Sequence, residues 1–443
     1  MKQFALFVFI LFAIYNGFAQ YQINYWENKN KLSEGNMVDG KEDSVWVYYH
    51  SNGTKWMEGS YQQGKKIGNW KSWYSNGKIQ NDFYPETGIF LSWYPDGTKE
   101  STGAYKDYLK DGKWVFYHKN GKISKKCTYI KDSLDGLCEE FHSNEVRSFK
   151  GIYLNNELQG VGSWWYDNGT IEMQGKLHNG LQDSIWLFYY NNGQLGSKGD
   201  FKDGLQEGVW IYYYETGQTW KSGAFKEGKR QGLWVAWYEK GKKQREGNFL
   251  DDKENGHWVQ WYESGIKMDE GDFCAGQMCG TWFGWYPDGI QKYHIQYQNN
   301  IKNGHYIYYW ENGKLRSEGT YKNDEKIGKW VEYSQLGNKL ESGKYIADKK
   351  EGMWSFYGKK GELARKQNFE NHLPNGKWME YYPNGQKQRE GSYDKLIKTG
   401  FWTYYDEKGK IVYKVQYKNG VKYKILVDEK EADIKNPGNN NIK

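Results

Sequence analysis

The sequence has little proline, little cysteine and, after residue 20, no long apolar run. Each of these shortages excludes some classes of protein. Proline occurs 6 times and cysteine 4 times in 443 residues. Beyond residue 20, no apolar stretch approaches the about 20 residues that a transmembrane helix needs. The 62 basic and 55 acidic residues are scattered, so no block of charge marks a nucleic-acid surface. The charge pattern is that of a mixed, solvated surface.

Glycine and aromatic residues, in contrast, are abundant and recur with a fixed period. The chain has 54 glycines and is 19% aromatic. A Gly-x-Trp-x-x-aromatic pattern returns every 24 residues, with one interval, from Trp70 to Phe90, shorter by four. Such a period predicts a repeat array, here of 16 units. The repeat-defining tryptophans are Trp46, Trp70, Trp114, Trp186, Trp210, Trp234, Trp258, Trp282, Trp330, Trp354, Trp378 and Trp402, and Phe90, Cys138, Gly162 and Tyr306 fill the same position elsewhere.

Each unit is predicted to form a β-hairpin. Runs of four to six residues rich in Trp, Tyr, Val and Ile are interrupted by glycine every few residues, which favours strands over helices. The first turn carries Asn-Gly or Asp-Gly, as at Asn384-Gly385, and these residues supply the positive φ of tight hairpins. We therefore predict an all-β fold, an elongated single-layer antiparallel β-hairpin repeat array. Stacking strands at ~4.8 Å gives a length on the order of 150 Å, with aromatic residues on both faces.

The second turn predicts which residues face each other. If the hairpin is symmetric, Gly223 lies opposite Trp234 and Phe225 lies opposite Gly232. Each ring would then cover a bare glycine, an arrangement that pins strand register. The cross-strand glycines named by this rule are Gly59, Gly199, Gly223, Gly247 and Gly271.

Irregular units test this pairing within the sequence. Where the glycine position becomes Cys127, the tryptophan position becomes Cys138, and Ile295 is matched in the same way by Tyr306. Paired changes are expected because a Cβ at the glycine position would collide with an indole. Gln367, predicted opposite a retained tryptophan, is an exception. In the shortened unit the register stays open.

The four cysteines form two pairs, each symmetric about a second turn. A cross-strand bridge needs a short Cβ separation. The pairs Cys127–Cys138 and Cys274–Cys279 are offset by three positions, so one of them alone has the ideal geometry. We favour the first as a disulfide and leave the second open. The C-x-x-x-x-C spacing is not a zinc pattern.

The ends of the chain differ from the array. Residues 1–19 combine Lys2, the apolar run Phe4–Ile14 and small residues before a cleavage point at Ala19, which predicts a secretory signal peptide. Its apolar run is too short to remain as a membrane anchor. Residues 20–45 form a degenerate capping unit, 46–427 the array, and 428–443 a charged, Asn-rich tail that we expect to be disordered. We therefore expect an exported protein, in the periplasm, at the cell surface or outside the cell.

Catalytic and metal-binding patterns are absent. The chain has no G-x-S-x-G elbow, phosphate loop or HExxH motif. His50, His118 and His142 share one repeat position, but equivalent positions lie about 9.6 Å apart, too far for one zinc ion. Tyrosine fills this position in most other units. We expect no enzyme, no cofactor and no metal site.

Three segments carry a family resemblance. GNWKSWYSNGK (Gly68–Lys78), GVWIYYYETGQ (Gly208–Gln218) and GKWMEYYPNGQ (Gly376–Gln386) resemble the bacterial variant of the MORN repeat. The resemblance covers about Val45–Lys422, and such proteins are often catalogued as YwqK-type antitoxins. It implies a β-hairpin scaffold for protein contact, in some cases lipid contact, without catalytic residues.

Three functions follow in order of preference. The first is a non-enzymatic exported scaffold that binds a protein along its repetitive face. The second is a carbohydrate- or envelope-polymer-binding surface, on which exposed rows of Trp and Tyr stack against sugar rings. The third is an antitoxin-like protein that neutralises a toxin. No nucleic-acid partner is expected, and membrane association is not expected beyond surface contact because no basic stripe is present.

The predicted signal peptide, residues 1–19, can be tested directly. We expect the mature chain to begin at Gln20, because the small residues Gly17 and Ala19 place the cleavage point after Ala19. Intact-mass measurement of the protein recovered from the producing cell's envelope or medium checks this. A chain that keeps residues 1–19 in those fractions would contradict it.

Overall fold

The structure is a computed structural model that describes residues 8–9 and 19–428. The predicted signal peptide, residues 1–19, lies outside this part except at residues 8–9 and 19, and the predicted tail lies outside it beyond residue 428. The described residues form β-strands joined by tight turns, with no helix among them. Each strand runs antiparallel to the strands before and after it in the chain, as β14–β16 show. The all-β repeat fold predicted from the sequence is confirmed.

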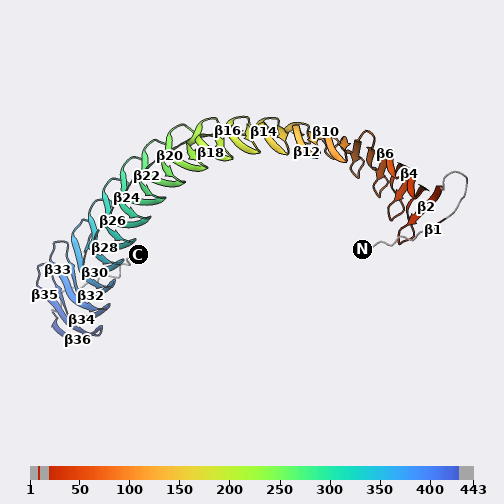
Figure 1. The fold of residues 1–443 in the computed structure, drawn as a ribbon. Helices are drawn as coiled ribbons and strands as arrows, with labels where there is room; N and C mark the ends of the chain where they lie inside the picture. Colours follow the sequence, from red (N-terminus) through yellow and green to blue (C-terminus); the bar gives the residue numbers. More distant parts are fainter. Residues whose placement is uncertain (1–7, 10–18, 429–443) are drawn as a thin grey trace. The chain divides into compact units, whose positions relative to one another are not determined.

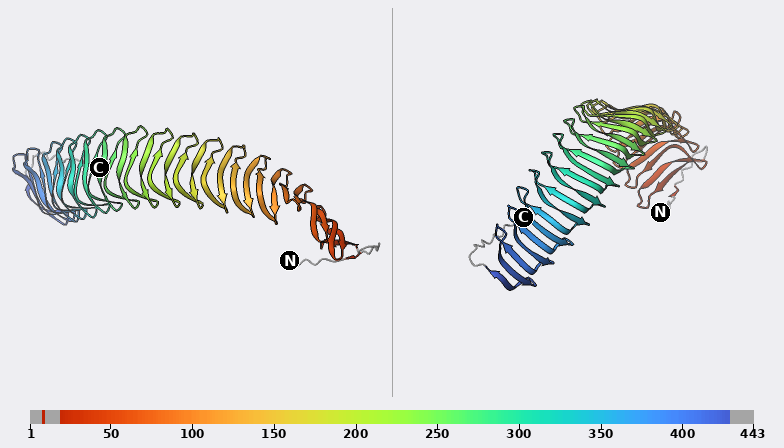
Figure 2. Two further views of the ribbon diagram at one scale, coloured as in Figure 1. Left: turned by 45° about the horizontal axis from the view of Figure 1, so that its top comes forward. Right: turned by 90° about the vertical axis from the view of Figure 1, so that its left-hand side faces the viewer.

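The chain divides into two compact units, described separately here. The first comprises residues 1–219 and 225–228, and the second comprises 220–224 and 229–443. Within each unit the strands stand side by side in a single layer (Figure 2). The order along the chain is shown in Figure 1.

The first unit contains β1 (Val8–Phe9), β2 (Ala19–Tyr25), β3 (Lys31–Val38), β4 (Lys41–Tyr49), β5 (Lys55–Gln62), β6 (Lys65–Trp73), β7 (Ile79–Tyr84), β8 (Ile89–Trp93), β9 (Lys99–Lys106), β10 (Leu109–Tyr117), β11 (Ile123–Ile130), β12 (Ser133–Phe141), β13 (Arg147–Leu154), β14 (Glu157–Trp165), β15 (Ile171–His178), β16 (Leu181–Tyr189), β17 (Leu195–Lys202) and β18 (Leu205–Tyr213). Strand β19 (Thr219–Lys226) has residues in both units.

The second unit contains β20 (Lys229–Trp237), β21 (Lys243–Leu250), β22 (Lys253–Trp261), β23 (Lys267–Cys274), β24 (Gln277–Trp285), β25 (Gln291–Gln298), β26 (Ile301–Tyr309), β27 (Leu315–Lys322), β28 (Glu325–Tyr333), β29 (Lys339–Ile346), β30 (Lys349–Tyr357), β31 (Leu363–Glu370), β32 (Leu373–Tyr381), β33 (Lys387–Asp394), β34 (Ile397–Tyr405), β35 (Ile411–Lys418) and β36 (Val421–Asp428).

The two turns of a repeat have different chemistry. In the first turn, Tyr166 and Thr170 close the loop through a backbone hydrogen bond of 2.9 Å, and Gly169 takes a φ of +89°. The second turn has two residues, such as Asn155 and Asn156 with φ of +50° and +68°. Two consecutive left-handed residues match the twist of the flanking strands. Asn and Asp dominate this position because they tolerate that conformation best after glycine.

The predicted pairing of glycine with tryptophan is confirmed. Gly247 lies directly opposite Trp258, and a Cβ added to Gly247 would overlap the indole. The five predicted glycines are covered in the same way by the tryptophan of the following strand: Gly59 by Trp70, Gly199 by Trp210, Gly223 by Trp234, Gly247 by Trp258 and Gly271 by Trp282. The irregular pairs also face each other as predicted, Cys127 with Cys138, Ile295 with Tyr306 and Gln367 with Trp378.

The second predicted pairing, of an aromatic residue such as Phe225 with a glycine such as Gly232, is wrong for the repeat. In the equivalent hairpin of β21 and β22, Phe249 faces Glu254 rather than Gly256, and Gly256 has a φ of +71°. The cause is a β-bulge, visible where Gly247 pairs with Trp258 but the next pair is Asn248 with Asn255. The extra residues of the bulge require one left-handed residue, which glycine supplies without strain. The glycine two residues before most of the tryptophans is therefore required by the backbone conformation and not by a covering ring, and Ser44 and Ser184 take the same left-handed conformation before Trp46 and Trp186.

The bulge also explains why this position is tryptophan. The indole Nε1 of Trp258 donates a hydrogen bond to the carbonyl oxygen of Asn248, 3.1 Å away, beside the bulge. A bulge leaves ladder groups unpaired, and the indole satisfies one of them while its ring covers the glycine. Ten tryptophans donate in this way to the carbonyl ten residues earlier: Trp46, Trp70, Trp114, Trp186, Trp210, Trp234, Trp258, Trp282, Trp330 and Trp354.

A second aromatic residue is wedged between successive tryptophans. Phe201 meets Trp186 and Trp210 edge to face, at centroid distances of 6.1 and 5.1 Å. Edge-to-face contacts of this kind stabilise aromatic clusters beyond their buried area. Because each wedge ring touches two neighbouring repeats, packing is carried from repeat to repeat on this face, which we call the tryptophan face.

The shortened unit keeps the pairing but loses the bulge. Phe83 of β7 faces Phe90 of β8, and no register shift interrupts this hairpin. Phe83 therefore stands at the glycine position, and Phe90 stands at the tryptophan position. The register that the sequence left open is thus set by a shorter hairpin with a direct pair of rings.

We expect Gly247→Ala to destabilise the second unit by about 1–3 kcal/mol, because its Cβ overlaps the Trp258 indole. Asn248→Ala is the matched control, since the Asn248 side chain is exposed and its backbone carbonyl remains. Urea unfolding combined with hydrogen exchange of β21–β23 measures the effect.

The double variant Gly247→Ala/Trp258→Tyr should recover part of this loss, because Ile295 faces Tyr306 in the native chain. Equal stability of Gly247→Ala and the control would contradict the close packing.

Candidate functional site

The tryptophan column belongs to the core. The twelve repeat-defining tryptophans are at most 7% exposed, because neighbouring aromatic rings pack on them and long cationic side chains cover several of them. Lys350, for example, places its ammonium 4.1 Å from the Trp354 ring centroid, a cation–π contact. The tryptophan column is therefore not available as a platform for sugar rings.

The histidine column has a structural role. The Nε2 atoms of His50, His118 and His142 lie 2.8–2.9 Å from the backbone carbonyl oxygens of Trp73, Phe141 and Trp165, in the next repeat. Where tyrosine fills this position the hydroxyl makes the same bond, as Tyr166 does to Tyr189 at 2.9 Å. No group of three metal-ligating side chains occurs among the described residues.

Both cysteine pairs lie at disulfide distance. Cys127 and Cys138 are directly opposite, with a Cα separation of 4.1 Å. Cys274 and Cys279 are 5.9 Å apart at Cα but not opposite, because the two-residue turn pairs Cys274 with Gln277 and Cys279 faces Asp272. The predicted symmetry holds for the first pair, and the second bridges diagonally beside the turn.

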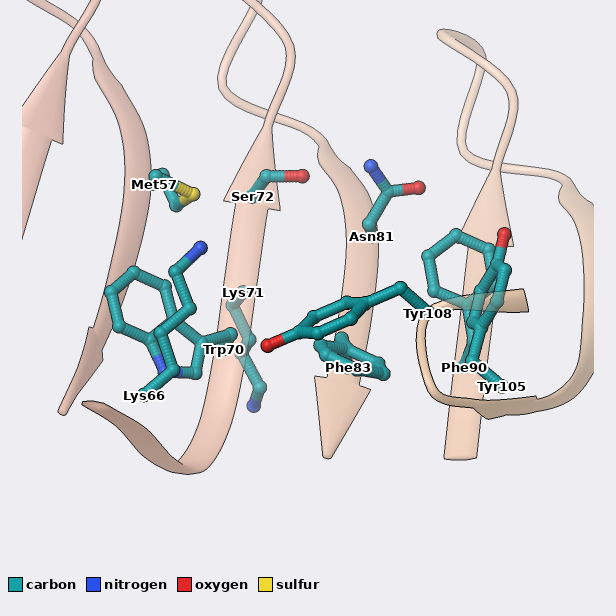
Figure 3. Close-up of a pocket in the computed structure, with 10 residues that line it drawn as sticks. All are labelled: Met57, Lys66, Trp70, Lys71, Ser72, Asn81, Phe83, Phe90, Tyr105 and Tyr108. Atoms are coloured by element: carbon teal, nitrogen blue, oxygen red, sulfur yellow. The ribbon is translucent and has the colours of Figure 1, made fainter. Parts of the chain in front are cut away.

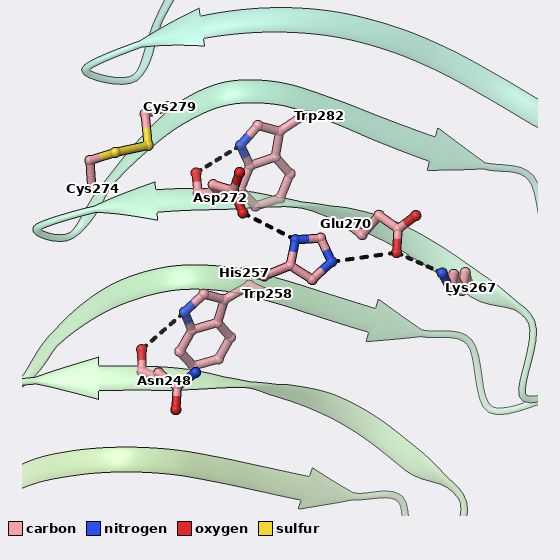
Figure 4. A network of polar contacts seen from close by, with 9 residues as sticks. All are labelled: Asn248, His257, Trp258, Lys267, Glu270, Asp272, Cys274, Cys279 and Trp282. Carbon is pink, nitrogen blue, oxygen red and sulfur yellow. Dashed lines mark hydrogen bonds and ion pairs between the residues drawn. A yellow bond between two sulfur atoms is a disulfide. The ribbon is translucent and has the colours of Figure 1, made fainter.

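A polar cluster lies near the second disulfide (Figure 4). The Nδ1 atom of His257 is 3.1 Å from a carboxylate oxygen of Asp272, and its Nε2 atom is 3.7 Å from Glu270. Glu270 also forms an ion pair of 2.6 Å with Lys267. These side chains are more than half exposed at His257 and Asp272, so the cluster is a solvated cross-strand contact of small stabilising value.

One row of aliphatic side chains is exposed on the face opposite the tryptophans. The residue before each tryptophan position points away from the tryptophan face, because neighbouring strand residues alternate. Four consecutive repeats of the first unit carry aliphatic residues here, and Ile152 lies directly opposite one of them, Leu137. We call this set the apolar row: Leu137, Ile152, Val161, Ile185 and Val209, between 44% and 66% exposed.

A groove opens on the tryptophan face of the first unit at the shortened hairpin (Figure 3). It has a volume of about 370 Å³, a size typical of small-ligand pockets. Trp70, Phe83, Phe90 and Tyr105 supply aromatic surface, and the exposed Tyr108 reaches in from the β9–β10 turn. Met57, Lys66, Lys71, Ser72 and Asn81 complete the lining.

The polar part of the groove is concentrated near β6. The Lys66 ammonium lies 4.2 Å from the centroid of the Trp70 ring, and desolvation lowers the pKa of this lysine from its usual 10.5. Burial raises the pKa of Tyr105. Ser72 is 9% exposed, and its Oγ has no hydrogen-bond partner. A buried hydroxyl without a partner is costly unless something binds it.

The groove was not predicted from the sequence. The four-residue shortening was visible there, but the register of this unit stayed open. The signal was present in the pair of phenylalanines, Phe83 and Phe90, that stand symmetrically about Pro85–Gly88. Neither position matched the Gly and Trp of the repeat, which concealed their equivalence.

Comparison with known proteins places the chain in a class of repeat proteins. The model of the MORN repeat variant matches residues 66–83, 110–131, 182–203, 206–227, 230–251, 302–323, 374–395 and 398–419. MORN repeats indicate a repeat scaffold or binding protein. No curated protein matches the sequence.

Solved structures add no functional information. A TcdB2–TccC3–Cdc42 crystal structure matches 91% of this chain at 11% identity, with a TM-score of 0.12. The Photorhabdus luminescens Tc holotoxin pore matches 91% at 12% identity, with a TM-score of 0.13. The chain spans about a quarter of the length of these solved chains, 26% and 25%. TM-scores this low support no argument about fold or function.

The structural role of the histidine column is testable in His142. His142→Tyr should keep the bond to the Trp165 carbonyl and leave stability unchanged, whereas His142→Phe should lose about 1 kcal/mol with that bond. Urea unfolding of the two variants measures the difference. A zinc-dependent rise in stability that is present in the native protein and lost in His142→Tyr would contradict this assignment.

Proposed function

We propose that the chain is an exported, non-enzymatic scaffold that binds a partner protein through the apolar row of the first unit. The observation that carries this proposal is the row itself, five exposed aliphatic side chains on one face, three of them on the adjacent strands β12–β14. Exposed apolar side chains clustered in this way mark interaction sites on protein surfaces.

The row is not a requirement of the fold. In the second unit the same repeat position holds His257, Thr281, His305, Lys329 and Lys377 in five of eight repeats, whereas the first unit has aliphatic residues in six of eight. The backbone pairing is the same in both, so the strands form equally well with polar residues there. Apolar residues at this position therefore favour a surface that is buried by a partner.

The spacing of side chains in the apolar row indicates what kind of surface the partner protein should present. Leu137, Val161 and Ile185 lie on alternate strands, about 9.6 Å apart. Ile152 lies on the strand between Leu137 and Val161, whereas the strands after Val161 and Ile185 carry Lys176 and Asp200 opposite them. The partner should therefore present apolar side chains at a similar regular spacing, with polar groups between them, as an extended protein element does.

Export is supported by two independent features. Residues 1–19 have the composition of a signal peptide. Both cysteine pairs lie at bonding distance, and disulfides persist mainly outside the reducing cytosol. A reducing compartment would suit the antitoxin-like alternative better, so the disulfides favour the exported scaffold.

The alternative function, carbohydrate binding, requires exposed rows of Trp and Tyr. The repeat-defining tryptophans are buried by their neighbours and do not form such a row. Stacking of sugars along the whole array therefore has little support, and the groove at the shortened hairpin is where aromatic rings remain open.

The double variant Val161→Lys/Ile185→Lys should weaken partner binding, because it places two charges within the apolar row. The control Leu154→Lys/Leu205→Lys changes two aliphatic side chains of similar exposure outside the row. Cross-linking to an envelope extract, followed by affinity measurement with the purified partner, compares the variants. We expect affinity to fall by about tenfold or more in the row variant and less than about twofold in the control.

Urea unfolding should show equal stability for both variants, since all four positions are exposed. A partner retained by the row variant, or lost equally from both, would overturn the proposal.

A further inference from the structure

The groove arises where the packing between repeats is interrupted. In the neighbouring repeats a wedge ring fills the space between successive large rings: Tyr61 packs on Trp70 at 4.8 Å, and Tyr105 packs on Phe90 and Trp114 at 5.2 and 5.1 Å. The wedge position of the shortened hairpin is Pro85, which lies in the turn after β7 ends. The shortened hairpin therefore has no wedge ring beside Phe83, which pairs with both Trp70 and Phe90, and the groove is the space left open there.

The shape of this space suits a flat ring. Figure 3 shows Phe83 in the middle of the groove, Trp70 on one side, and Phe90 with Tyr105 on the other. Figure 3 shows Tyr108 reaching across Phe83 with its hydroxyl on the Trp70 side. Tyr108 is 85% exposed and is held in a left-handed conformation with a φ of +62°. A large aromatic ring at such a turn position is unusual, since Asp132 and Asn156 occupy it elsewhere.

The polar groups determine the chemistry of the occupant. The buried Ser72 Oγ lines the groove without a hydrogen-bond partner. Lys66 makes no ion pair with a carboxylate within the described residues, and no acidic side chain lines the groove. An occupant that satisfies these groups carries hydroxyls and a negative charge, together with an apolar ring face for the aromatic residues.

We propose that the groove binds an acidic saccharide, with a hexuronate ring between Tyr108 and Phe83. The sugar's C–H face packs on the aromatic rings, and its carboxylate pairs with the Lys66 ammonium. Its ring hydroxyls bond with Ser72 Oγ and the Asn81 side chain. An inserted aromatic side chain would fill the same space but would leave Ser72 and Lys66 unpaired, so the sugar is favoured. The groove lies on the tryptophan face, opposite the apolar row, and the two sites are independent.

Calorimetric titration of the full chain with trigalacturonate tests the proposal. The matched neutral probe is the fully methyl-esterified trisaccharide, which keeps the rings and removes the charge. We expect the acid to bind about tenfold more tightly than the ester. Tyr108→Asn and Lys66→Gln should each weaken binding of the acid by about tenfold.

The variants have internal controls. Tyr108→Asn introduces the residue type that Asn156 has at the same turn position, with a φ of +68°. Because asparagine adopts this conformation there, the variant should keep the hairpin. Lys110 lies over Trp114, at 5.0 Å, as Lys66 lies over Trp70, and Lys110→Gln should leave binding within about twofold. Ser72→Ala should weaken binding while preserving the fold, because it removes a hydroxyl without a partner.

Four results would overturn the proposal. They are no binding of trigalacturonate at about 10 mM, equal binding of acid and ester, equal effects of Lys66→Gln and Lys110→Gln, and tighter binding of N-acetyltryptophan amide than of the sugar. The last result would identify an inserted aromatic side chain as the occupant. None of these results bears on the apolar row, which is on the opposite face.

Discussion

The indole that covers a bare glycine is the interaction on which the rest of this structure depends. At Trp258 the ring fills the space above Gly247, and its N–H satisfies the carbonyl of Asn248 beside the bulge. One side chain therefore fixes the register, buries apolar surface and repairs the ladder where the extra residues enter. Each of these tasks needs a neighbouring strand, so a repeat gains its stability from adjoining repeats.

The two faces of the sheet therefore differ in how much their amino-acid sequence can vary. On the tryptophan face the indoles and wedge rings must meet, and the few departures are compensated, as at Cys127 and Cys138. On the opposite face, the residue before the tryptophan position makes no contact with these rings, and it varies from aliphatic, as at Val161, to polar, as at His257. Functional differences between parts of the array can therefore arise there without loss of the fold.

The shortened hairpin is the exception that opens the tryptophan face. Four missing residues shift the wedge position into the turn at Pro85. The array continues because Phe83 and Phe90 still pair, but no wedge ring fills the space beside them, and this space forms the groove that Tyr108 also lines. A break in a regular packing scheme gives a repeat protein a local site that the repeat itself does not contain.

The sequence by itself determined the all-β repeat fold, its 24-residue period and the opposition of Gly223 and its equivalents to tryptophan. These three features follow from local patterns, because the repeat period and the glycines that lack a Cβ can be read directly from the order of the residues. The tertiary structure decided that Phe249 faces Glu254 rather than Gly256, because a bulge changes the register without altering the residue spacing. It also decided the groove, since that space depends on which rings of separate strands meet. The residues that line the groove are visible in the sequence, but the distances between their side chains depend on how the strands pack.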